Sequence, residues 1–139
     1  MKNFKSLLTV ALVAFAMVSC TKLDKVLPKA DGVWKVTSEV YVAYENGVET
    51  EREVTAAADF GTYTFKDDET GTYSAAGQAD EAFTWTTNSD GDKLILTMTA
   101  FPIAVTIDVL ELKSKSQTWF FAFEDGTDRE ETTIMLERE

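Results

Sequence analysis

Residues 33–47 read V-W-K-V-T-S-E-V-Y-V-A-Y-E-N-G, and this stretch sets the fold class. The even positions from Trp34 to Tyr44 are apolar except for Ser38, whereas the odd positions begin with Lys35, Thr37 and Glu39. A period of two with one apolar side predicts a half-buried β-strand over residues 33–45. Asn46-Gly47 is a strong signal for a tight hairpin turn, so the chain is expected to fold back at once.

The same pattern recurs to the end of the chain. Glycine and acidic residues separate the apolar alternations at 67–71, 88–92 and 125–126, and the apolar parity changes between Val109 and Leu110, where we expect a β-bulge. No stretch predicts a helix of any length. Further strands are predicted at 48–55, 62–66, 72–75, 81–87, 93–99, 103–112, 117–124 and around Ile134 and Leu136. Eight or nine short antiparallel strands must close or stack to hide their edges, which predicts an all-β up-and-down barrel or a sandwich.

The pattern of the N-terminal residues predicts that the protein is exported. Lys2 and Lys5 precede an uncharged run over residues 6–19 that ends at Cys20, the only cysteine. This layout is typical of a secretory signal peptide, and the run is short of the about 20 apolar residues that a spanning helix needs. Met17-Val18-Ser19-Cys20 resembles the lipobox of bacterial lipoproteins, which implies that Cys20 is acylated and becomes the first mature residue. An ordinary signal peptide with an incidental cysteine is the alternative.

These features divide the chain into three parts. Residues 1–19 are expected to be a cleaved lipoprotein signal peptide, residues 20–30 a lipidated tether, and residues 31–139 a single barrel domain. Several acyl chains on Cys20 would hold the domain on a membrane more firmly than one chain can. Thr21 is not the aspartate that retains enterobacterial lipoproteins in the inner membrane. We therefore expect the outer membrane and leave the periplasmic or surface leaflet open.

Composition excludes several kinds of function. Loss of residues 1–19 would remove Lys2 and Lys5 and no acid, so the net charge would change from −11 to −13. Such a surface disfavours nucleic-acid binding, which depends on basic residues. The chain has no histidine, and Cys20 would be consumed by lipid, which removes the Ser-His-Asp and Cys-His arrangements and the usual zinc ligands. The acids of 67–69 and 90–92 are interpreted as solvated turn residues, so we expect no enzyme, no metal site and no cofactor.

Short motifs carry a family resemblance. Asp31-Gly32-Val33-Trp34-Lys35-Val36 is similar to the G-x-W opening of lipocalins. Together with T-Y-T-F-K-D-D-E-T-G-T-Y (62–73), F-T-W-T (83–86) and D-K-L-I-L-T (92–97), the domain resembles the lipocalin-like domain of Bacteroidota lipoproteins. The resemblance implies a lipocalin-like barrel and an arginine of the last strand across the tryptophan. Arg138 is then expected to stack on Trp34 as a cation–π pair.

The barrel interior is the remaining candidate for a site. An eight-stranded barrel is wide enough to be filled by its own side chains or to hold one small ligand. The first hypothesis is an envelope lipoprotein that binds a small apolar or amphipathic molecule without catalysis. The second is a solid-core structural or interaction lipoprotein that meets an unidentified protein partner. The residues expected to line or fill the interior are Tyr63, Phe65, Phe83, Trp85, Met98, Trp119 and Phe121.

Overall fold

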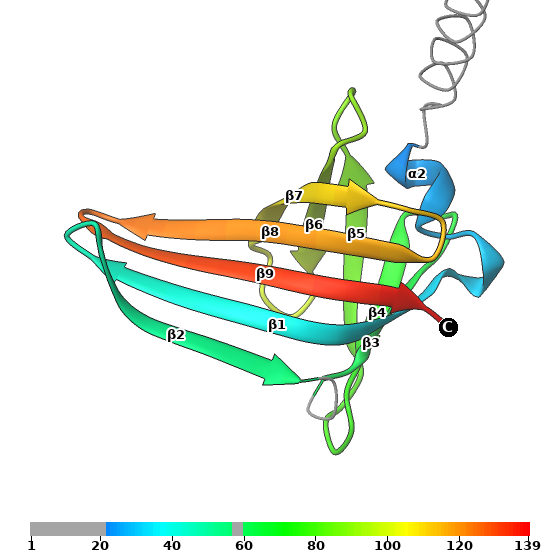
Figure 1. The fold of residues 1–139 in the computed structure, drawn as a ribbon. Helices are drawn as coiled ribbons and strands as arrows, with labels where there is room; N and C mark the ends of the chain where they lie inside the picture. Colours follow the sequence, from blue (N-terminus) through cyan, green and yellow to red (C-terminus); the bar gives the residue numbers. More distant parts are fainter. Residues whose placement is uncertain (1–21, 57–59) are drawn as a thin grey trace, which may run out of the picture.

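A computed structural model describes residues 22–56 and 60–139, so the expected signal peptide and Cys20 lie outside the described residues. The described chain is almost entirely antiparallel β-structure (Figure 1). Its elements are α2 (Leu23–Val26), the 3-10 turn η1 (Ala30–Gly32), β1 (Val33–Glu45), β2 (Val48–Ala56), β3 (Thr62–Phe65), β4 (Thr70–Ser74), β5 (Glu81–Thr87), β6 (Lys93–Met98), β7 (Ala104–Leu112), β8 (Ser116–Asp125) and β9 (Asp128–Arg138).

Eight of the strands close into a barrel. From β3 to β9 each strand pairs with the next along the chain, and β1 closes the ring by pairing with β3 on one side and β9 on the other. β2 pairs with β1 and lies outside this ring. The prediction of an antiparallel up-and-down barrel of eight or nine strands is therefore confirmed. The expected bulge near Val109 is also present, as a register shift between Val109 and Glu111 against β8.

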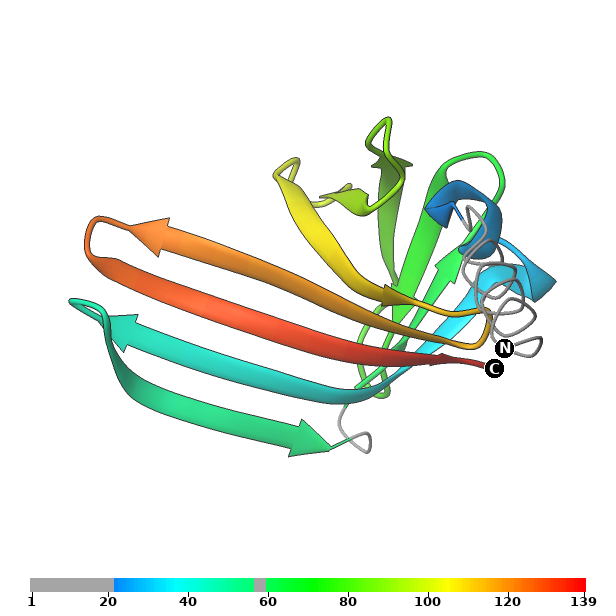
Figure 2. The same cartoon turned by 45° about the horizontal axis from the view of Figure 1, so that its top comes forward.

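The strand β1 changes its neighbour along its length. Residues 33–35 pair with β3, and residues 38–45 pair with β2 instead. Because β8 and β9 also continue past the short strands β3–β7, the sheet β8-β9-β1-β2 extends beyond the barrel (Figures 1 and 2). We call residues 38–45, 48–56, 121–125 and 128–133 the projecting sheet. Its inner face is the one on the same side of the strands as the side chains of the barrel lumen, and its outer face is the opposite one.

A bulge at Thr37 reverses the faces of β1. Trp34 and Val36 point into the lumen, but the register with β9 shifts between Val36 and Ser38. Beyond the shift Glu39 pairs with the buried Ile134, so the odd positions of β1 now lie on the inner face. The sequence pattern put all the even positions on one buried side, and the structure differs because a bulge inverts the alternation that follows it.

The base of the barrel is closed by the segment before β1. Leu23, Val26 and Leu27 are 0%, 5% and 0% exposed and belong to the hydrophobic core. The stretch expected to be a tether over residues 20–30 is therefore part of the folded domain from Leu23 onward, because its apolar residues cover one end of the lumen. In the described part of the chain, neither α2 nor η1 is long and apolar enough to cross a membrane.

We predict that Gly71→Ala destabilises the barrel. A Cβ at position 71 would lie 2.2 Å from ring atoms of Phe83 and 2.6 Å from the carbonyl oxygen of Thr64. Overpacking of this kind costs about 1–3 kcal/mol in the free energy of unfolding, measured by urea denaturation. Ala82→Ser at an exposed position of the adjacent strand is the control, with an expected change within about 0.5 kcal/mol. Equal effects of the two changes would contradict the packing described for Phe83.

Candidate functional site

The structure gathers all seven predicted interior residues into one cluster. Phe65, Phe83, Trp85 and Trp119 are between 0% and 5% exposed. Tyr63, Met98 and Phe121 are half-buried and pack against the same core. The alternation therefore identified the side chains that meet inside the barrel, although they come from the four strands β3, β5, β6 and β8.

Aromatic rings fill the centre of this cluster. The Phe65 ring centroid lies 5.3 Å from that of Phe83, 5.5 Å from Trp85 and 6.0 Å from Trp119. The interplanar angles are 62°, 83° and 86°, so these are edge-to-face contacts, which aromatic rings favour. At this level of the lumen, side chains occupy the space that a ligand would need.

The open end of the barrel is more polar. The Tyr63 ring lies 4.7 Å from that of Tyr73 and 5.2 Å from that of Trp119. Burial, followed by the neighbouring Tyr73, Glu39 and Glu81, raises the pKa of Tyr63 above its ordinary value, so its hydroxyl stays protonated. Burial and the charge of Glu53 likewise raise the pKa of Glu39. Half-buried rings, hydroxyls and carboxylates therefore meet at the mouth.

The predicted pair at the base is confirmed. The guanidinium carbon of Arg138 lies 4.5 Å from the Trp34 ring centroid. Trp34 Nε1 donates a hydrogen bond to the carbonyl oxygen of Leu27 at 3.0 Å, and Arg138 Nη2 donates to the carbonyl oxygen of Val26. Burial lowers the pKa of Arg138. The pair thus fixes the segment that closes the lumen to the two strands that close the ring.

One polar residue of the interior was not identified from the sequence. Gln117 is 1% exposed and accepts a hydrogen bond from Trp119 Nε1 at 2.8 Å. Its Nε2 has no hydrogen-bond partner among the described residues. The signal was present, since Gln117 lies two residues before Trp119 and so points to the same side of β8. A polar residue on the buried face of a strand is an informative exception.

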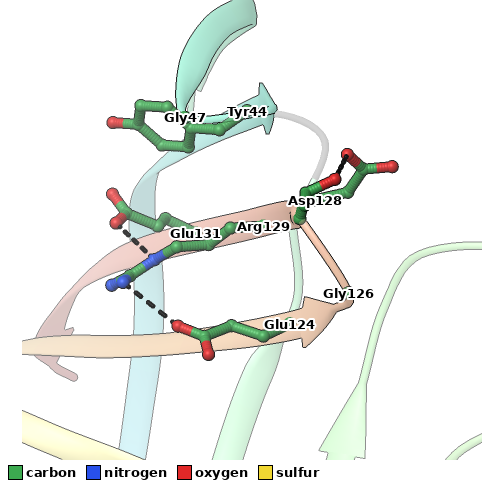
Figure 3. Close-up of a pocket in the computed structure, with 8 residues that line it drawn as sticks. Tyr44, Gly47, Glu124, Gly126, Asp128, Arg129 and Glu131 are labelled. Carbon is green, nitrogen blue, oxygen red and sulfur yellow. Dashed lines mark hydrogen bonds and ion pairs between the residues drawn. The ribbon is translucent and has the colours of Figure 1, made fainter.

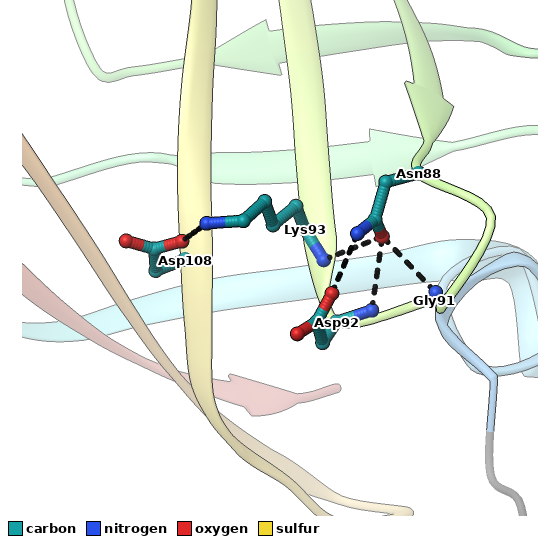
Figure 4. A network of polar contacts seen from close by, with 5 residues as sticks. All are labelled: Asn88, Gly91, Asp92, Lys93 and Asp108. Atoms are coloured by element: carbon teal, nitrogen blue, oxygen red, sulfur yellow. Dashed lines mark hydrogen bonds and ion pairs between the residues drawn. The ribbon is translucent and has the colours of Figure 1, made fainter.

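The acidic turn at residues 88–92 is stabilised by hydrogen bonds to Asn88. The Oδ1 of Asn88 accepts from the backbone N–H groups of Gly91, Asp92 and Lys93, and its Nδ2 donates to Asp92 (Figure 4). Lys93 in turn pairs with Asp108 on the neighbouring strand. In residues 22–56 and 60–139, no group of three or more His, Cys, Asp or Glu side chains is placed to hold a metal ion.

A cavity of about 450 Å³ lies at the tips of the two long hairpins, on the outer face of the projecting sheet (Figure 3). Arg129 crosses it, with Nη1 3.2 Å from Glu124 and Nε 2.9 Å from Glu131. Tyr44 of β1 also lines the cavity, on the strand next to β9. Arg129, Glu124 and Glu131 already pair with one another, so among the charged residues of the lining only Asp128 is without an ion pair to a described residue.

We predict that Arg138→Ala lowers the free energy of unfolding by about 1–2 kcal/mol. The change removes a cation–π contact, worth about 0.5–1 kcal/mol, and one hydrogen bond to a backbone carbonyl. Tryptophan emission should change in the native background and not in a Trp34→Phe background. The control is Arg52→Ala, which breaks an exposed ion pair with Glu49 and should change the free energy of unfolding much less. An unaltered unfolding curve for Arg138→Ala would contradict the role assigned to the pair.

Comparison of the chain with models of protein families, with curated proteins and with solved structures gave no match in any of the three.

Proposed function

We propose that this chain is a non-catalytic binding lipoprotein of the cell envelope, held on the outer membrane by lipid on Cys20. Its barrel would bind a small amphipathic molecule at the open mouth. The single observation that supports this proposal is the distribution of exposure within the aromatic cluster: its members are buried toward the closed base, and Tyr63, Met98 and Phe121 are half-buried.

The chemistry of the mouth suggests how such a molecule would be held. Phe121 and Met98 offer an aromatic ring and an adaptable thioether to an apolar tail. The charges of Glu39 and Glu81 help to raise the pKa of Tyr63, so the polar end of a ligand there would meet a hydroxyl and negative charge. An amphipathic ligand with a polar or cationic head fits this arrangement better than a purely apolar one.

A second candidate is a solid-core interaction lipoprotein. The filled centre of the lumen favours it, because Phe65, Phe83 and Trp119 are no more than 1% exposed. The Phe65 ring contacts those of Phe83 and Trp119 in edge-to-face geometry. In that case all recognition would occur on the outside of the barrel, with a protein partner in the envelope.

Native mass spectrometry of residues 21–139, incubated with a lipid extract of bacterial outer membrane, separates the two candidates. We expect a one-to-one adduct that Phe121→Ser weakens by about tenfold or more, since a buried aromatic contact contributes about 1.5–3 kcal/mol. Phe120→Ser is the matched control, because this half-buried residue lies on the opposite face of β8. If only the mass of the unliganded protein is observed, with an extract from which a known lipocalin takes up ligand, the solid-core candidate is favoured.

A further inference from the structure

The acidic residues on the two faces of the projecting sheet differ in whether they form ion pairs. On the outer face, Arg52 lies 2.8 Å from Glu49, and Arg129 pairs with both Glu124 and Glu131 (Figure 3). Within residues 22–56 and 60–139, the inner-face acids are not within ion-pairing distance of any lysine or arginine. These inner-face acids are Glu39, Glu45, Glu51, Glu53, Asp125, Asp128 and Glu130.

The strand register arranges the inner face into rows. One row runs across the four strands as Phe121, Thr132, Tyr41 and Glu53. The next row, two residues along, runs as Phe123, Glu130, Ala43 and Glu51. Phenylalanines therefore occupy the β8 side, carboxylates the β2 side, and the small Thr132 and Ala43 alternate with larger side chains between them. With strands about 4.8 Å apart, the aromatic and acidic borders lie roughly 14 Å from each other.

The aromatic border is open to solvent. Phe123 is 52% exposed and its ring lies 5.8 Å from that of Phe121. A recess of about 190 Å³ lies beside it, lined by Phe123, Asp125, Asp128 and Glu130 together with Glu124 of the outer face. Burial, followed by the carboxylates of Glu130 and Glu51, raises the pKa of Tyr41.

We propose that the inner face of the projecting sheet is a docking surface for an extended, arginine-rich segment of a partner protein. Charge complementarity selects a basic partner, because the face presents unpaired carboxylates on a chain of net charge −11. Arginine suits it better than lysine, since a planar guanidinium can pair with Glu130 and also stack on Phe123, the residue opposite it on β8.

The shape of the face favours a polypeptide over a small molecule. Small-molecule sites enclose most of their ligand, whereas this face is open and is crossed by four strands. Glu51 and Glu53 are two residues apart on β2, which places their Cα atoms about 6.6 Å apart along the strand. Alternate side chains of an extended peptide have the same spacing, so consecutive arginines can meet consecutive rows.

This surface goes beyond the proposed function and does not depend on it. The two sites adjoin and share Phe121, but a small molecule at the mouth would otherwise contact Tyr63 and Met98. The carboxylates changed in the test below, Glu51, Glu53 and Glu130, lie farther along β2 and β9. A variant can therefore lose peptide binding and keep small-molecule binding, or the reverse, and the two affinities can be measured separately.

The test uses the full chain in a neutral detergent and a synthetic peptide of alternating arginine and leucine. We expect binding by calorimetry at low ionic strength, and a loss of about tenfold or more in the triple variant Glu51→Gln, Glu53→Gln, Glu130→Gln. The matched control, Glu49→Gln, Glu124→Gln, Glu131→Gln, changes the net charge by the same amount on the outer face. It should alter affinity by less than about threefold. Phe123→Ser should reduce the preference for the arginine peptide over its lysine counterpart, and circular dichroism verifies that each variant is folded.

Several results would overturn the proposal. Equal losses in the two triple variants would show attraction to net charge alone rather than to a face. Absence of binding by the unaltered chain would exclude the surface as a docking site for basic segments. Binding of a small cationic amphiphile, competitive with the peptide and equally tight, would assign the inner face to a small molecule instead.

Discussion

The pairing of β1 with β9 is the constraint on which the rest of the structure depends. It runs from Trp34 to Tyr44, farther than any other pairing of β1, and it closes the ring of eight strands. At one end it carries Trp34 and Arg138, which hold the segment that covers the base. At the other end it supports the projecting sheet, because β2 and β8 attach to these two strands. Closure, base and projecting sheet are thus consequences of one register.

This architecture separates packing from recognition. Large side chains fill the lumen near its centre, and an antiparallel barrel gains stability from such filling because each buried ring removes a large apolar area from water. The surfaces left for binding are then the mouth, where rings and carboxylates meet, and the inner face beyond it. The bulge at Thr37 determines the character of that face, since it turns Glu39 and Tyr41 inward and places Val42 on the outer face.

Much of the fold follows from local pattern. The strand over 33–45, the turn at Asn46-Gly47 and the seven interior side chains all follow from alternation and turn chemistry, and the contact of Arg138 with Trp34 was expected from resemblance. Two features could not be predicted locally. The bulge at Thr37 depends on the register with β9, almost a hundred residues away. The burial of Leu23 and Leu27 depends on a lumen that needs a cover, which a short mixed-charge segment does not reveal by itself. The unpaired acids of the inner face, likewise, emerge only when four strands are set side by side.

Native-state hydrogen exchange of the full chain tests the central role of the β1–β9 pairing most directly. We expect the amides of residues 33–45 and 134–138 to exchange slowest, because their strands are paired on both sides and open only with the whole barrel. Residues 48–56 should exchange fastest among the strands, since β2 has one free edge. Early exchange of β1 and β9, or protection of β2 equal to that of β1, would contradict this role.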